Sequence, residues 1–247
     1  MKKQAGISLT EILISLFLTS VMITVLVQLY LISKRQYMEI EKILTMRFDV
    51  QWAIDLLSDS IRRAGFTPCL SIDRLHVVDR RNPRHRIYAL QTGNQPHPYI
   101  EINRMTEYFA KIVKIRDATK VLVQNQGSFH RQRLVLIADC EHAEIQEVVN
   151  IEEHAGNSLI TLSKPLLFSY GKGTYIGEYL EEKWLIRKNT SHENTLHYQR
   201  VKAEEVTPLI HFMHIRNRRI KEKQFLEIIL DLDEDKTQEI KVVVRGS

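Results

Sequence analysis

The residue types that could bind a metal ion are present in this chain, but their spacing does not suit a metal centre. The ten histidines are scattered, and the closest pair, His211 and His214, lies three residues apart in an extended apolar stretch. Neighbouring side chains of a strand point to opposite faces, so an odd spacing separates these two imidazoles. The histidines therefore predict no metal site.

Three aspartates near the C-terminus, Asp231, Asp233 and Asp235, resemble the opening of a calcium-binding loop. However, Lys236 occupies the position of the turn glycine, and Val242 occupies that of the bidentate glutamate. A solvated hairpin tip is the better interpretation. The sequence also contains no phosphate-binding loop and no nucleophile elbow, so it predicts no enzyme and no cofactor.

The chain has one basic cluster, whose guanidinium groups are the residue type that grips DNA phosphates. Its members are Arg80, Arg81, Arg84 and Arg86, and a second basic stretch comprises Arg216, Arg218, Arg219, Lys221 and Lys223. Neither has aromatic residues interleaved for base stacking. Solvated loops are therefore the main interpretation, and nucleic-acid contact at the four loop arginines stays as the alternative.

The elements that would position these residues follow from composition and from one unusual segment. The chain has 247 residues, of which 44% are apolar and 26% charged, with a formal net charge of +5. These values suit a globular domain with an appendage and exclude a disordered chain. Residues 12–32 contain no charge, and as a helix they would be about 30 Å long, enough to cross a bilayer once.

A cleavable secretory signal is the alternative for this segment, but its apolar part usually has only about 7–15 residues. No small-residue cleavage site lies between Tyr30 and Tyr37. The positive-inside rule by itself would place the body in the cytoplasm, because two lysines precede the segment and four basic residues follow it: Lys34, Arg35, Lys42 and Arg47.

The residues before the apolar segment have a pattern of their own. Two lysines are followed by Gly6, then Ile7 and Glu11, after which no charge occurs until Lys34. This pattern resembles the leader of type IV prepilins. The resemblance implies that a prepilin peptidase cuts the Gly6–Ile7 bond at the cytoplasmic face and leaves the apolar segment on the mature protein. The resemblance also implies N-methylation of the new terminus. At the position of Ile7, however, the commonest residue in the family is phenylalanine.

The resemblance also implies a role for Glu11, which would become the fifth residue of the mature protein. A carboxylate at the edge of an apolar segment needs a partner. Cleavage would create one in the α-amino group of Ile7, on the same chain or on a neighbour in a filament. The alternative is an acidic residue that only marks the start of a helix.

Apolar residues recur at steps of three and four from Tyr37 to Ala64, which predicts one helix over residues 8–64, ended by Gly65. The pattern then alternates with period two, which predicts a mainly antiparallel sheet. Strands are expected at residues 108–115, 120–123, 133–137, 147–151, 158–162, 173–179, 182–187, 195–200, 224–232 and 239–244, the last two forming a hairpin. The fold class expected is α+β, with the long helix packed on the sheet.

Three further segments narrow the resemblance to PilW-like minor pilins. They are residues 55–69 at the helix end, residues 136–143 around the second cysteine, and the late strands at 174–176, 195–198 and 207–210. The implied organisation is a leader (1–6), a transmembrane and filament-core half-helix (7–33), an amphipathic half-helix (34–65) and a β-rich body outside the cytoplasm (66–247).

An extracytoplasmic body makes a disulfide between Cys69 and Cys140 the simplest use of the two cysteines, and this leaves a thiol-protease nucleophile without support. Two unpaired core thiols are the alternative.

The resemblance implies a minor pilin that helps to start or cap type IV pili. Its expected partners are prepilin peptidase, other minor pilins, the major pilin and the inner-membrane assembly platform, with DNA as a weaker candidate. The expected location is the inner membrane before assembly and the pilus surface afterwards. A minor pseudopilin of a type II secretion system, or a bitopic receptor or enzyme, are the alternatives.

Overall fold

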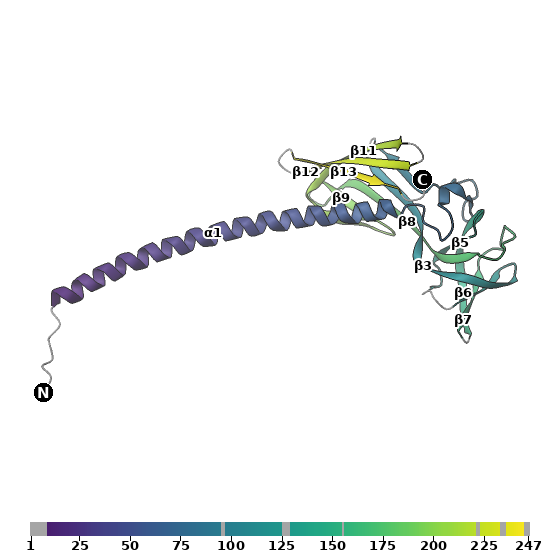
Figure 1. Ribbon diagram of the computed structural model, residues 1–247, viewed down its shortest axis with the longest axis horizontal. Helices are drawn as coiled ribbons and strands as arrows, with labels where there is room; N and C mark the ends of the chain where they lie inside the picture. The colour runs from purple at the N-terminus through teal and green to yellow at the C-terminus, as the bar shows by residue number, and fades with distance from the viewer. Residues whose placement is uncertain are drawn as a thin grey trace, which may run out of the picture. The chain divides into compact units, whose positions relative to one another are not determined.

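The structure is a computed structural model that describes residues 9–94, 97–124, 129–154, 156–220, 223–232 and 236–244. The chain divides into two compact units, Met1–Asp49 and Val50–Ser247. The described part of the first unit is helical throughout. It belongs to α1 (Leu9–Arg62), which continues into the second unit (Figure 1).

The predicted long helix is confirmed, with its end at Arg62 followed by a turn over residues 63–65 that contains the expected stop, Gly65. Gly65 has φ +72°, a left-handed backbone conformation that residues other than glycine rarely adopt. A Cβ atom built on it would lie 2.5 Å from Ser71 Oγ and 2.6 Å from Ala89 Cβ. The Gly65 N–H donates to the Asn103 carbonyl oxygen at 2.9 Å, so the turn is fixed to a strand as well as being sterically tight.

The second unit contains one 3₁₀ turn and thirteen strands over its described residues. They are η1 (Ile72–Arg74), β1 (His76–Asp79), β2 (Leu90–Gly93), β3 (Tyr99–Asp117), β4 (Lys120–Gln124), β5 (Leu134–Ala138), β6 (His142–His154), β7 (Asn157–Leu162), β8 (Tyr175–Lys188), β9 (Asn194–Gln199), β10 (Ala203–Thr207), β11 (Ile210–Ile220), β12 (Lys223–Leu232) and β13 (Thr237–Val243). All strand pairs are antiparallel except β1 with β6. The mainly antiparallel α+β fold class is confirmed.

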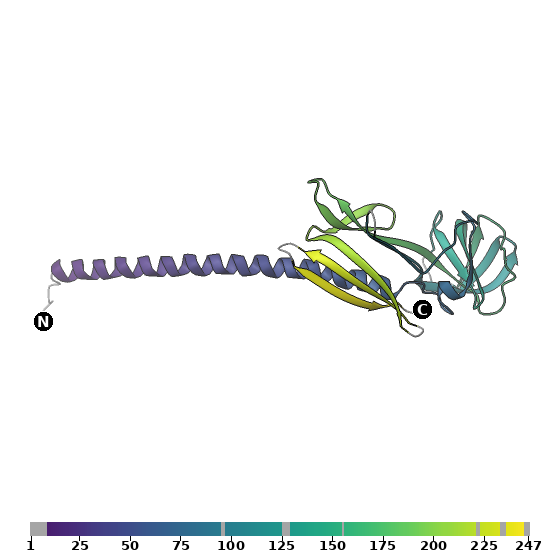
Figure 2. The same cartoon turned by 90° about the horizontal axis from the view of Figure 1, so that it is seen from above.

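Six of the strands close into a barrel. The pairings run from β3 to β4, β7, β6, β5 and β8, and β8 pairs with β3 again. Figure 2 shows the teal strands β4 to β7 of this barrel rolled around one another. The interior is filled by small and branched side chains, including Val121, Val135, Ile137 and Ile160. Closure leaves the barrel no free sheet edge along this path.

The other ends of β3 and β8 belong to a second core, in which a sheet of order β10-β9-β8-β3-β2 faces the sheet β11-β12-β13. The last turns of α1 belong to the same core through Ala53, Ile54, Leu57 and Ile61, and Ala64, in the turn after the helix, joins them. The helix therefore packs on the body from Val50 onward, whereas side chains 34–49 of the predicted amphipathic half are exposed.

Two strand predictions were wrong because β3 and β8 each run through three hydrophobic clusters of the described body. β8 is one continuous strand, although two strands separated by a break between residues 179 and 182 were expected. The break was expected because the apolar alternation is interrupted at Tyr179 and Leu180, which are both buried. β3 begins at Tyr99 and not at residue 108, because a register shift between Met105 and Phe109 changes which face is buried. The β12–β13 hairpin is confirmed. The short strands β1, β2 and β10 were not predicted, and β11 was expected only as an extended apolar stretch around His211 and His214.

Candidate functional site

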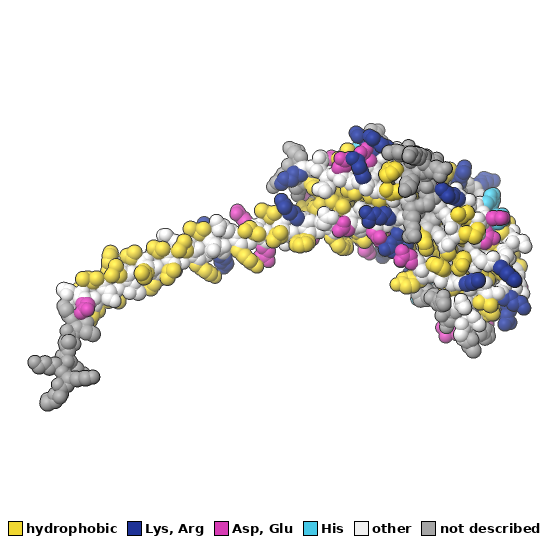
Figure 3. Space-filling model, viewed as in Figure 1, with side chains coloured by type: hydrophobic (Ala, Val, Ile, Leu, Met, Phe, Trp, Pro, Cys, Tyr) yellow, Lys and Arg dark blue, Asp and Glu magenta, His cyan; other side chains and the backbone are white. Residues whose placement is uncertain are grey.

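The apolar part of α1 has an unusual surface for a protein in water. Every side chain from residue 9 to residue 49 is exposed, including Leu16 (62%) and Phe17 (68%). Figure 3 shows hydrophobic side chains along the visible face of this stretch, with charged side chains among them toward the body. The helix is long and apolar enough to cross a membrane, with a mean hydropathy of 2.4 over its best window.

Two threonine hydroxyl groups within this segment are satisfied by the helix itself. Thr19 Oγ1 donates to the Ser15 carbonyl oxygen at 2.7 Å, and Thr24 Oγ1 donates to the Ser20 carbonyl oxygen at 2.9 Å. An unpaired hydroxyl would be costly in hydrocarbon, so these bonds make the two threonines compatible with a lipid or helix-packed environment.

Glu11 lies in the first turn of α1, and it is the one acidic residue of the described helix before Glu39. It is exposed, and no described basic side chain forms an ion pair with it. Gly6 and Ile7, the expected processing residues, lie outside the described residues. The carboxylate thus stands at the edge of the apolar surface, and its pairing with a processed terminus stays a prediction.

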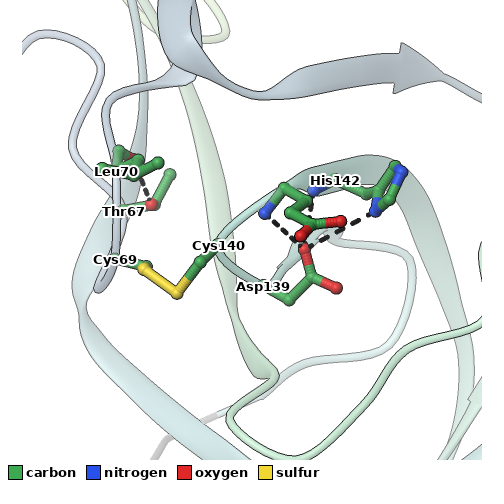
Figure 4. Close-up of a disulfide and its surroundings, with 7 residues drawn as sticks. Thr67, Cys69, Leu70, Asp139, Cys140 and His142 are labelled. Carbon is green, nitrogen blue, oxygen red and sulfur yellow. Dashed lines mark hydrogen bonds and ion pairs between the residues drawn. A yellow bond between two sulfur atoms is a disulfide. The ribbon is translucent and has the colours of Figure 1, made fainter.

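Cys69 and Cys140 form a disulfide with a Cα–Cα distance of 5.3 Å. Cys69 lies in the loop after α1, where Thr67 Oγ1 donates to the Leu70 carbonyl oxygen. Cys140 lies in the turn between β5 and β6, which is held by Asp139 Oδ1 accepting the N–H groups of Glu141 and His142 (Figure 4). The predicted bond therefore ties the helix exit to the barrel.

Two of the four loop arginines are used within the fold. Arg81 Nη2 lies 2.8 Å from Asp79 Oδ2, and this hydrogen-bonded contact raises the pKa of the guanidinium. Arg80 Nε lies 3.8 Å from Glu144 Oε2, while its Nη2 donates to the Pro165 carbonyl oxygen at 3.2 Å. Both side chains bind neighbouring segments of the same chain.

The other two loop arginines are exposed. Arg86 lies 5.1 Å above the centre of the Tyr88 ring, a cation–π contact, and Arg84 has no ion pair within the described parts of the chain. The four residues therefore divide into a pair that binds carboxylates of the fold, Arg80 and Arg81, and a pair for which the described residues show no ion pair, Arg84 and Arg86. Nothing in this arrangement tests nucleic-acid contact.

The sequence analysis missed Glu144, a carboxylate on β6 with 0% exposure. It accepts hydrogen bonds from Gln146 Nε2 at 3.0 Å and from the Leu167 N–H at 3.2 Å. Burial raises the pKa of this group, and the two hydrogen bonds oppose that shift. The contact with Leu167 spans 23 residues, so only the fold brings these two residues together.

The remaining candidates form no centre. The described residues include no group of three or more side chains that could hold a metal ion, and His211 and His214 both lie on β11. Asp233 and Asp235 lie outside the described residues.

The geometry defines a class of protein: a chain with one long exposed apolar helix joined to a β-rich body that carries one disulfide. Comparison with known proteins adds no family to this class, because no protein-family model, no curated protein and no solved structure matches the chain.

Proposed function

We propose that this chain is the precursor of a minor pilin, a membrane-inserted subunit that enters a type IV pilus through its N-terminal helix. The observation that carries the proposal is the surface of α1, whose side chains are all exposed from residue 9 to 49 and uncharged from residue 12 to 33. Such a surface needs lipid or neighbouring helices around it. A subunit that moves from the membrane into a filament would have lipid around this surface first and neighbouring helices afterwards.

The residues before this surface support a processed subunit and not a permanently anchored protein. The prepilin-like order of Gly6, Ile7 and Glu11 places the cut just outside the apolar segment. A new α-amino group at Ile7 would be about one helical turn from Glu11 and of opposite charge. Each subunit would then neutralise Glu11 with its own terminus or with that of a neighbour.

The body would lie in the periplasm before assembly and on the pilus surface afterwards. The disulfide supports this location, because such bonds persist in oxidising compartments. The proposed partners are prepilin peptidase, other minor pilins, the major pilin and the inner-membrane assembly platform. Association would start or cap filament growth.

The decisive experiment is mass spectrometry of the intact chain, extracted from membranes of cells with and without prepilin peptidase. We expect a chain that starts at Ile7 in the first case and retains residues 1–6 in the second. A chain that still starts at Met1 beside an active peptidase would refute the proposal.

Assembly can be tested separately with a matched pair of carboxylates. Glu11→Gln should reduce recovery of the chain in sheared pili. The control Glu39→Gln, at an exposed residue further along the same helix, should not reduce it. Equal recovery of both variants would contradict the role of Glu11 while leaving processing intact.

The same helix and leader would serve a minor pseudopilin of a type II secretion system. Co-purification of the full chain from membranes separates the two, since the bound minor subunits belong to one system or the other. A bitopic receptor or enzyme would keep residues 1–6.

A further inference from the structure

The second unit contains a cleft of about 840 Å³ that none of the assembly features uses. Its walls are the segment 72–78, which includes η1 and β1, the loop at 83–88, and two amide side chains, Asn217 and Gln224, from β11 and β12. Its volume is within the range of small-molecule binding sites.

The cleft lies where the row of buried apolar side chains on β11 and β12 ends and amide side chains follow. On β11 the inward side chains Met213 and Ile215 are 0% and 4% exposed, and the next inward position is Asn217. On β12 the inward Leu226 is 0% exposed, and the preceding inward position is Gln224. The core therefore stops there, and hydrogen-bonding groups line the opening.

The opposite wall is positively charged. Arg74, Arg84 and Arg86 line the cleft, against one carboxylate, Asp73, whose Oδ1 already accepts the Ala89 N–H at 2.8 Å. Across the described ranges, no acidic side chain forms an ion pair with Arg74 or Arg84. These two guanidinium groups differ in this respect from Arg80 and Arg81, which bind carboxylates of the fold.

We propose that this cleft binds an acidic saccharide, with Arg74 and Arg84 on a sugar carboxylate and Asn217 on hydroxyl groups. A guanidinium fork matches a carboxylate with two parallel hydrogen bonds, and an amide both donates to and accepts from a hydroxyl. Single-stranded nucleic acid fits less well. Its bases stack on open aromatic faces, whereas Arg86 already lies 5.1 Å above the Tyr88 ring.

The inference does not depend on filament assembly, and it is tested with the full chain in a polyoxyethylene detergent, whose head group is not a sugar. Calorimetric titration with a galacturonic acid tetramer in about 50 mM salt should give saturable binding, since charge contacts are strong at low ionic strength. The neutral galactose tetramer should bind about tenfold more weakly or less.

A matched pair of double variants locates the site. Arg74→Gln with Arg84→Gln should weaken binding about tenfold or more, whereas Arg131→Gln with Arg133→Gln should leave it nearly unchanged. All four residues are exposed, and both pairs remove the same charge. Asn217→Trp, which fills the cleft without changing the charge, should also weaken binding.

Four results would overturn the proposal. The galacturonic acid tetramer could fail to show saturable binding, or the neutral tetramer could bind equally well. Both double variants could weaken binding equally, or the Asn217→Trp variant could bind as well as wild type. Tighter cleft-dependent binding of a thymidine oligonucleotide would assign the site to nucleic acid instead. Unchanged thermal unfolding of each variant shows that a loss of binding is local.

Discussion

Removal of the disulfide should have a large and calculable effect on the stability of the second unit. Replacing Cys69 and Cys140 by alanine opens a loop of 71 residues. In the loop-closure treatment, this raises the entropy of the unfolded chain and lowers the free energy of unfolding by about 4 kcal/mol. Domains are typically stable by only about 5–15 kcal/mol, so the loss is a substantial fraction of the total.

Urea unfolding of the full chain in detergent measures this change through tryptophan fluorescence. Trp184 is 0% exposed and reports on the core shared by α1 and both sheets, whereas Trp52 is 58% exposed. A Trp52→Phe background leaves Trp184 as the reporter. Dithiothreitol should destabilise this parent by a similar amount and should not affect the double alanine variant.

A loss below about 1 kcal/mol would refute the reasoning, because it would mean that the unfolded chain gains little freedom from a loop of this length. Destabilisation of the double alanine variant by dithiothreitol would show that the reductant acts elsewhere.

Three further outcomes follow from the packing and the electrostatics. Gly65→Ala should cost about 2–4 kcal/mol through its positive φ and its contacts, whereas Gly171→Ala, with open space around its Cβ position, should be nearly neutral in thermal unfolding. Leu57→Ala should cost about 2–5 kcal/mol, and Leu44→Ala, at 50% exposure, below about 0.5 kcal/mol; equal effects would contradict the observed packing. Because burial raises the pKa of Glu144, its protonation favours the folded state, so wild type should gain stability relative to Glu144→Gln as the pH falls from 7 to about 4.5. A stability difference that does not vary with pH would contradict this.

The helix and the disulfide could be anticipated because their signals are local. The charge-free run before Lys34 and the steps of three and four up to Ala64 predict a helix whatever surrounds it. Gly65 is required by its own backbone angle. With two cysteines in the chain, the expectation of an oxidising compartment was enough to pair them.

The separate hydrophobic clusters and the cleft could not be anticipated because their signals are distributed. Alternation fails at Tyr179 and Leu180, where β8 changes the core that it fills, and the sequence does not mark that change. Arg74 and Asn217 line one cleft although 143 positions separate them along the chain. Local patterns showed that four loop arginines are close in sequence, but only the fold shows that Arg80 and Arg81 bind carboxylates.

The position of the disulfide has a mechanical consequence. In the proposed filament, tension would pull on the body through α1, and the first covalent branch point after the helix is Cys69. Force would pass across the sulfur atoms to Cys140, so the 71-residue loop could not be drawn out while the bond is intact. At about 3.5 Å per extended residue, this withholds roughly 250 Å of contour length from a stretched subunit.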